Sequence, residues 1–218
     1  MKLRPLFVLL LFVASAGVLV WIYHTATHTK RKQRTDLWTE TITDLDACCR
    51  RKHVKAMQYD HFAGIAQDEH AGDASRLFRA MALSERVQEG NCADAILRLN
   101  GKYTPPAKVV VFRGTTEGNL QRSIAYERQS LATLGGGDIR RALDRGNRYA
   151  ARMLAWATAG DLRHIVLMEH CRQGLHDPAD RNPGYLVCPV CGNLYAVGYS
   201  DAYCPICLTE SGRFIRFE

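Results

Sequence analysis

The sequence predicts a mainly α-helical protein with three parts: an N-terminal transmembrane helix, a four-helix bundle and a small C-terminal metal knuckle. An uncharged apolar stretch near the N-terminus is long enough to span a bilayer. The long region after it has helical periodicity and few β-branched runs. Two C-x-x-C pairs lie near the C-terminus. The expected domains are 1–35 (anchor and basic linker), 36–176 (bundle) and 177–218 (knuckle).

The charge balance does not by itself identify a partner. The chain of 218 residues carries a net charge of +7, from 29 Lys and Arg against 22 Asp and Glu. Such an excess fits either nucleic acid or an anionic membrane surface. Part of it lies in Lys30-Arg31-Lys32, directly after the apolar segment, as is common beside a membrane span. We therefore predict no nucleic-acid partner.

The apolar segment runs from Pro5 to Tyr23 without a charged residue, and Trp21 and Tyr23 lie at its far end. At about 1.5 Å per residue it just spans a hydrocarbon core of about 30 Å. The alternative is a signal peptide cleaved after Ala14-Ser15-Ala16, which would leave an exposed apolar stub. We predict a single-pass membrane anchor. The basic cluster after the span favours the cytoplasmic side for the rest of the chain, and the periplasmic side stays open.

Four amphipathic helices are expected in the bundle, and their connections predict its topology. Two connections are short, at Glu69–Gly72 and at the triple glycine 135–137. The third, residues 101–115, contains Pro105-Pro106 and spans about 50 Å when extended, enough to run the length of a bundle. Two short connections and one long crossover are typical of a ferritin-like bundle. The predicted helices are 36–69, 73–100, 116–134 and 138–175.

The apolar stripe of each predicted helix is interrupted near its middle by a charged residue. The four interruptions are Lys52, Glu85, Glu127 and Asp161. A single one could lie at the edge of the bundle, but four at similar depth on neighbouring helices predict a common site. Asp161-x-x-His164 strengthens this interpretation, because residues three apart share a helix face and bundles bind metals with such pairs.

The two C-x-x-C pairs predict a four-thiolate metal site. Cys188 and Cys191 form one pair, Cys204 and Cys207 the other, with twelve residues between the pairs. Two tight turns of this kind direct four sulfurs at one ion, and disulfides are the less consistent alternative. We expect iron, with zinc as the alternative, since both accept four thiolates. Iron would transfer single electrons, whereas zinc would be structural only.

A ferritin-like bundle followed by a C-x-x-C knuckle resembles rubrerythrin. The segments that carry the resemblance are Tyr59–Ala63, Ser75–Ala80, Asn119-Leu120 and Cys188-Pro-Val-Cys-Gly. The resemblance covers residues 36–218. It implies a homodimeric peroxide reductase in which a di-iron centre in the bundle reduces peroxide. A rubredoxin-like iron would relay electrons to that centre from an unidentified reductase.

The di-iron ligands that the resemblance implies are only partly present. The glutamate of the first helix falls on Lys52, and one glutamate of the third helix falls on Ser130. The histidine of the second helix falls on Gln88. Under the resemblance, these losses affect mainly one iron position and leave the other nearly intact. The ligand positions that are kept are Glu85, Glu127, Asp161 and His164.

Charge counting predicts how the bundle site is neutralised. Three buried carboxylates carry about −3, and Lys52 contributes about +1, which leaves about −2 for one divalent ion. We therefore expect a single Fe, Mn or Zn bound by the kept ligands, with Lys52 in place of the lost metal. The alternative is an empty bundle in which Lys52 pairs with the carboxylates and one or two of these stay protonated.

Two classes of function follow. The first is an oxidoreductase that reduces or senses peroxide at the single-metal bundle site, with Glu85, Glu127, Asp161, His164 and Lys52 as its reactive groups and the knuckle as electron source. The second is a binding or carrier protein: a membrane-tethered rubredoxin-type electron carrier, or a zinc-knuckle scaffold, in either case with an inactive bundle.

Overall fold

The computed structural model describes residues 16–28, 37–134, 136–175 and 183–218. The chain divides into two compact units, Met1–Thr39 and Glu40–Glu218. The second unit contains the helical bundle and the C-terminal knuckle, which form one continuous structure.

The prediction of a transmembrane anchor is wrong for the described part of the chain. Across the described ranges, none of the helices is both long and apolar enough to cross a membrane. The N-terminal helix covers residues 16–28 and its second half is polar, with His24, Thr25 and Thr27. Residues 1–15 of the predicted span lie outside the described residues. The predicted single-pass membrane localisation is corrected accordingly.

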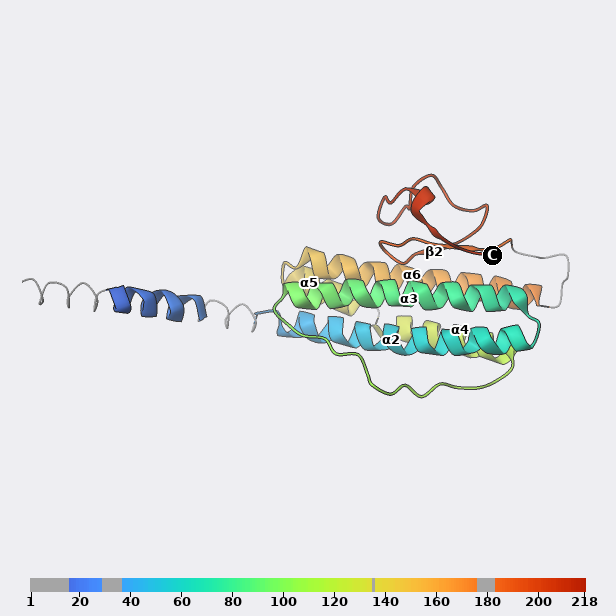
Figure 1. Cartoon of the computed structure of the whole chain (residues 1–218), viewed down its shortest axis with the longest axis horizontal. Helices are drawn as coiled ribbons and strands as arrows, with labels where there is room; N and C mark the ends of the chain where they lie inside the picture. Colours follow the sequence, from blue (N-terminus) through green and yellow to red (C-terminus); the bar gives the residue numbers. More distant parts are fainter. Residues whose placement is uncertain (1–15, 29–36, 135, 176–182) are drawn as a thin grey trace, which may run out of the picture. The chain divides into compact units, whose positions relative to one another are not determined.

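The second unit is built on four long helices, as predicted (Figure 1). A short turn joins α2 to α3, a long crossover joins α3 to α4, and a segment with a short helix of its own joins α4 to α6, which confirms the ferritin-like topology. On α2 the buried positions recur every three or four residues, the period of a helix with one face in the core. The long helices are α2 (Thr39–Asp68), α3 (Gly72–Arg98), α4 (Thr116–Leu134) and α6 (Arg148–Gly174).

The helix predicted over 138–175 is in fact two helices, a short α5 (Gly137–Asp144) and α6. The break is at Gly146, whose φ of 76° lies in the left-handed region that ends helices. Asn147 then caps α6, because its side-chain oxygen accepts a hydrogen bond from the Ala150 backbone N–H at 3.0 Å. In the Gly146-Asn147 dipeptide, the glycine ends α5 and the asparagine begins α6.

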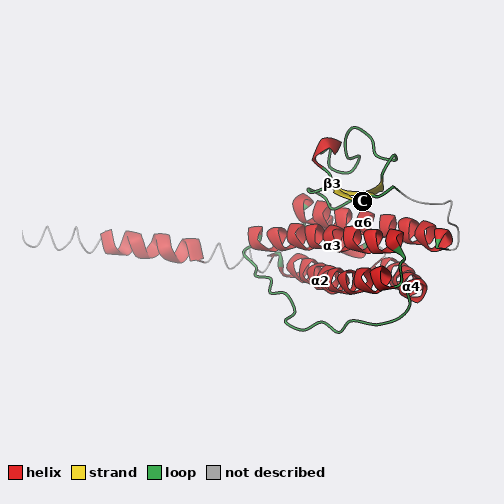
Figure 2. Cartoon of the chain, turned by 45° about the vertical axis from the view of Figure 1, so that its right-hand side comes forward, coloured by secondary structure: helices red, strands yellow, loops and turns green. Residues whose placement is uncertain are grey.

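The crossover between α3 and α4 runs along the bundle (Figure 2). Glu69, just after α2, accepts a hydrogen bond from the backbone N–H of Thr116, which places the start of α4 at the α2–α3 turn. The crossover is also held at Phe112, whose N–H and C=O both form hydrogen bonds with the side chain of Gln58. This confirms the predicted long connection.

The C-terminal knuckle is a three-stranded antiparallel sheet with two cysteine turns. The strands β1 (Tyr185–Val187), β2 (Leu194–Ala196) and β3 (Ile215–Phe217) are ordered β2-β1-β3. Val187 pairs with Leu194 on one side and Ile215 on the other. Tyr185, Val187 and Leu194 are buried in the same apolar cluster as Phe78 of α3 and Met168 of α6. The knuckle is thus packed on its own bundle through these two helices.

The break at Gly146 leads to a prediction about stability. Gly146→Ala is expected to destabilise the protein by about 1 kcal/mol, because an L-residue is strained at this positive φ even where space is free. Gly90→Ala, inside α3 and equally free of clashes, is the control and is expected to stabilise by up to about 1 kcal/mol. Urea denaturation measures both. Equal effects of the two substitutions would contradict the assignment of the break to Gly146.

Candidate metal knuckle and buried charge cluster

The four predicted cysteines meet at the ends of two matching turns. In the first turn, Gly192 N–H donates to the carbonyl of Cys188 at 3.0 Å. In the second, Leu208 N–H donates to the carbonyl of Cys204 at 2.8 Å. The turns thus repeat the same backbone bond from the residue after the second cysteine to the first.

The sulfur atoms of the knuckle fit a tetrahedral metal ion. Cys188 Sγ lies 3.5 Å from Cys207 Sγ, and Cys191 Sγ lies 3.5 Å from Cys204 Sγ. A tetrahedron with metal–sulfur bonds of about 2.3 Å has edges only slightly longer than this. Backbone N–H groups also point at the sulfurs, among them that of Asn193 at Cys191. The cysteines are free of disulfides and therefore available as thiolate ligands.

The two turns differ in the residue that follows the second cysteine. Gly192 has φ 76° and Leu208 has φ 64°, so both adopt the left-handed conformation. At Gly192 a Cβ would lie 2.8 Å from the backbone oxygen of Ser84, so only glycine fits against α3. Leu208 is 77% exposed, and nothing in its surroundings demands a glycine. The first turn therefore faces the bundle and the second faces outward.

The charged residues predicted for the bundle site do meet, and a second lysine joins them. The buried charge cluster consists of Lys52, Lys55, Glu85, Glu127, Asp161 and His164, all of them buried. The lysines come from α2, Glu85 from α3, Glu127 from α4, and Asp161 and His164 from α6. Each long helix of the bundle thus contributes to the cluster at the same depth.

Lys55 occupies the centre of the cluster. Its Nζ lies 2.9 Å from both carboxylate oxygens of Glu127, 2.9 Å from Glu85 Oε1 and 2.6 Å from Asp161 Oδ1. Lys52 lies beside it, with its Nζ 3.1 Å from Glu85 Oε2 and in contact with Asp161 Oδ1. Lys52 also donates to the backbone carbonyl of Ala157 at 3.2 Å. Every carboxylate of the cluster therefore contacts at least one ammonium group.

The contacts around His164 are those that a doubly protonated ring would make. The hydroxyl of Ser84 donates its only proton to the backbone carbonyl of Gly192. His164 Nε2, 2.9 Å from Ser84 Oγ, must therefore be the donor in that contact. His164 Nδ1 lies 3.1 Å from Glu85 Oε1, and a carboxylate only accepts. This ion-pair distance and the raised pKa of His164 both favour the imidazolium form.

The pKa directions agree with a fully ionised cluster. Burial alone would raise the pKa of Glu85 and of Glu127, but the neighbouring lysines and His164 outweigh burial and hold each pKa at about 2. Burial would lower the pKa of His164, yet Glu127 and Glu85 raise it above its usual value. Burial likewise opposes the charge on Lys55, and the carboxylates, led by Asp161, raise its pKa. Three cations then face three carboxylates.

The positions of Lys55 and His164 decide whether the bundle can hold a metal ion in this arrangement. One donor atom from each of Glu85, Glu127, Asp161 and His164 lies within 4.8 Å of the others, a spacing that suits a metal ion. The Lys55 ammonium, however, already contacts all three carboxylates, and a doubly protonated imidazole has no lone pair to donate. A metal would fit only after Lys55 moved away and His164 lost a proton.

Sequence reasoning missed three residues of this region. Lys55 follows Lys52 by three positions on the same helix face, a signal that was present in the sequence. Tyr59 enters the sequence analysis only within a segment that resembles rubrerythrin, but its hydroxyl donates to Glu127 Oε1 at 2.8 Å. Ser84 had no sequence signal, because its role depends on Gly192, far along the chain.

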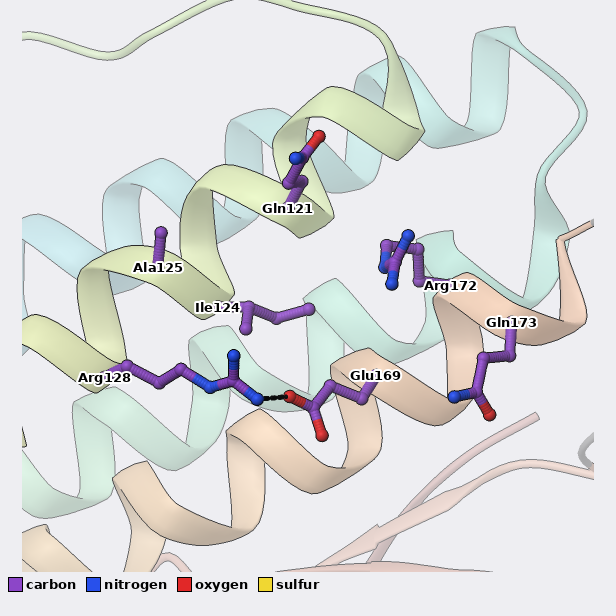
Figure 3. A pocket seen from close by; sticks show the side chains of 7 residues that line it. All are labelled: Gln121, Ile124, Ala125, Arg128, Glu169, Arg172 and Gln173. Carbon is purple, nitrogen blue, oxygen red and sulfur yellow. Dashed lines mark hydrogen bonds and ion pairs between the residues drawn. The ribbon is translucent and has the colours of Figure 1, made fainter.

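A separate groove of about 480 Å³ lies between α4 and α6 (Figure 3). The Arg128–Glu169 ion pair crosses it. None of its lining residues belongs to the buried charge cluster or to the knuckle. The lining residues are Gln121, Ile124, Ala125, Arg128, Glu169, Arg172 and Gln173.

The pKa directions predict how stability depends on pH. Glu85 and Glu127 have pKa values near 2 in the folded protein against 4.5 normally, so the stability they contribute is complete above pH 4.5 and is lost as the pH falls towards 2. A carboxyl shifted this far contributes about 3 kcal/mol. We expect the free energy of unfolding, measured by urea and helical circular dichroism, to fall over that range. Glu127→Gln should flatten the fall, whereas Asp46→Asn, at a surface pair with Arg50, should not. Equal pH profiles for both variants would refute the assignment.

Comparison with known proteins shows which fold this is. Neither a protein-family model nor a curated protein matches the sequence. Among solved structures, nigerythrin in its mixed-valence state has a TM-score of 0.68 at 22% identity, over 81% of this chain and 86% of that one. The fully reduced, all-ferrous state of nigerythrin has a TM-score of 0.69 at 22% identity, over the same shares of the two chains. Bacterioferritin from Desulfovibrio desulfuricans, with its di-iron site, has a TM-score of 0.59 at 17% identity, over 67% of this chain and 86% of that one. The chain therefore has the fold of nigerythrin, a rubrerythrin-family protein, which confirms the resemblance drawn from its sequence.

Proposed function

We propose that this protein is a one-electron carrier of the rubredoxin type, in which the four cysteines bind iron and the bundle is a redox-inactive support. The observation that carries the proposal is the position of Lys55. Its ammonium group lies within 2.9 Å of oxygens from all three carboxylates that would otherwise bind metal. The two lysines thus supply the positive charge that a metal would bring.

Electrostatics supports a bundle without metal. With Lys52, Lys55 and His164 protonated, the three cations balance the three carboxylates, and the net charge of the cluster is zero. A divalent ion added to this state would leave about +2 in a buried region, which is strongly unfavourable. The sequence-based count of −2 omitted Lys55 and the proton on His164. Peroxide reduction at the bundle is therefore not the function we favour.

The knuckle supports the carrier role. Cys188, Cys191 and Cys204 are buried, while Cys207 is partly exposed. Iron held by four thiolates exchanges one electron. The protein holds the thiolates in fixed turns and keeps water from three of them. The exposed edge at Cys207 gives a redox partner close approach.

A second candidate is favoured by one observation, the convergence of Glu85, Glu127, Asp161 and His164 within 4.8 Å. If Lys55 swings away, these residues match the single Fe, Mn or Zn site expected from the sequence, with peroxide reduction or sensing as its activity. The third candidate is a zinc-loaded knuckle that serves only as a scaffold. The homodimer also stays a prediction.

Metal content and colour separate the three candidates. We expect the purified full-length protein to bind one iron per chain, with the visible absorption of a ferric thiolate. Cys188→Ser combined with Cys204→Ser should abolish both. Hydrogen peroxide should not be turned over when an electron donor is supplied. A second equivalent of metal together with peroxide turnover would establish the bundle candidate, and a colourless zinc protein the scaffold.

The role of the lysines can be tested by restoring metal binding. Lys52→Glu combined with Lys55→Ala removes both ammonium groups and adds a fourth carboxylate to the cluster. The charge of the cluster is then about −4 once His164 loses its proton. We expect this variant to take up one to two extra divalent ions per chain, measured by elemental analysis. The control is Lys102→Glu with Lys108→Ala, the same change at exposed positions of the crossover, which should bind none. If the variant keeps its helical dichroism and binds no metal, the lysines are not what excludes it.

A further inference from the structure

A continuous line of hydrogen bonds and ion pairs joins the buried charge cluster to the knuckle. Glu85 contacts His164, His164 donates to Ser84 Oγ, and Ser84 donates to the backbone carbonyl of Gly192. Gly192 directly follows the ligand position Cys191. Within the described residues, Ser84 is the side chain through which this line passes from the bundle to the metal-binding turn.

We infer that Ser84 is a positioning residue that raises the reduction potential of the four-cysteine site by polarising the peptide after Gly192. The inference rests on the proposed function, since it requires iron in the knuckle. It extends that proposal, because the charge cluster would then influence the reduction potential of the four-cysteine site through the hydrogen bond of Ser84.

The direction of every donor in the line is determined by its partner. A backbone carbonyl only accepts, so Ser84 is the donor to Gly192. Its oxygen then accepts from His164 Nε2 at 2.9 Å and from Gln88 Nε2 at 3.3 Å. A hydroxyl that accepts from a cation is a stronger donor, because hydrogen bonds in a chain polarise one another. The positive charge of His164 is thus transmitted towards the knuckle.

The peptide that Ser84 polarises is the one that contacts a sulfur. The carbonyl of Gly192 and the N–H of Asn193 belong to the same peptide unit. The Asn193 N–H is hydrogen-bonded to Cys191 Sγ. Drawing electron density to the carbonyl oxygen makes this N–H a better donor to the sulfur. An N–H···S bond stabilises the more negative, reduced state of a thiolate-bound iron, and therefore raises its potential.

The packing holds this peptide in a fixed place. A Cβ at Gly192 would lie 2.8 Å from the Ser84 backbone oxygen, so the turn and α3 are in direct contact. Two other side chains also bind the knuckle backbone: Asn91 Nδ2 donates to the Val190 carbonyl at 2.8 Å, and Arg163 Nε to the Leu194 carbonyl at 3.0 Å. Asn91 docks the same turn without contacting the charge cluster, which makes it a matched comparison.

The experiment measures the reduction potential of the full-length, iron-loaded protein by optical redox titration. Ser84→Ala is expected to shift the reduction equilibrium about tenfold towards the oxidised form, which for one electron is about 59 mV more negative. Ser84→Thr keeps the hydroxyl and should restore most of the potential. Ser75→Ala, a buried α3 serine that donates to the Ala63 carbonyl, and Asn91→Ala should leave it nearly unchanged.

The outcomes separate this inference from the proposed function. If the wild type shows no ferric-thiolate absorption, the proposed function itself fails. If the wild type titrates normally and Ser84→Ala has the same potential, only the role of Ser84 is refuted. Equal shifts in Ser84→Ala and Asn91→Ala would assign the effect to docking of the knuckle and also refute it. Should Ser84→Ala not fold, a wild-type potential in His164→Gln, which keeps a donor but removes the charge, would overturn the inference.

Discussion

The contact on which the rest of the structure depends is that of the Lys55 ammonium with carboxylates from three helices. Three negative charges in an apolar interior would be prohibitive without matching cations, and the lysines of α2 with His164 provide them. Because the partners come from α2, α3, α4 and α6, the cluster can form only when these helices are aligned at one depth. A buried ionic group of this kind favours a single register more than it adds stability.

In the metal-free bundle that we propose, the same cluster takes the electrostatic role of a metal centre without its chemistry. A metal in such a bundle neutralises carboxylates and also offers open coordination positions and a change of oxidation state. Ammonium groups neutralise the carboxylates equally well, and they offer neither. Tyr59 and Ser84 add hydrogen bonds to the cluster, Tyr59 at Glu127 and Ser84 at His164. Lys52 and Gln88, at positions where the resemblance implies metal ligands, are therefore accommodated in the same type of bundle.

The sequence predicted the bundle, the knuckle and five members of the cluster, because helical periodicity and C-x-x-C spacing are local signals. Lys55 was missed because steps of three and four from Lys52 reach both Lys55 and Ala56, and the prediction took one charged interruption per helix. The proton on His164 depends on the orientation of Ser84, and hence on Gly192 in another part of the fold. The transmembrane prediction counted apolar residues, whereas the described helix at 16–28 ends in polar residues. The break at Gly146 carried a visible signal that was not used.

The two cysteine turns of the knuckle differ in their surroundings. Both turns need a residue at positive φ, but only Gly192 lies against α3, where any side chain would clash. Leu208 accepts the same conformation at a cost of about 1–2 kcal/mol and extends into solvent next to Cys207. The buried turn is therefore the one on which the bundle acts, through a fixed backbone contact. The open turn exposes part of Cys207 and an apolar side chain. Under the proposed function, Ser84 would act on the metal site from one edge and electrons would leave from the other, so that a partner could dock without disturbing the contact with the bundle.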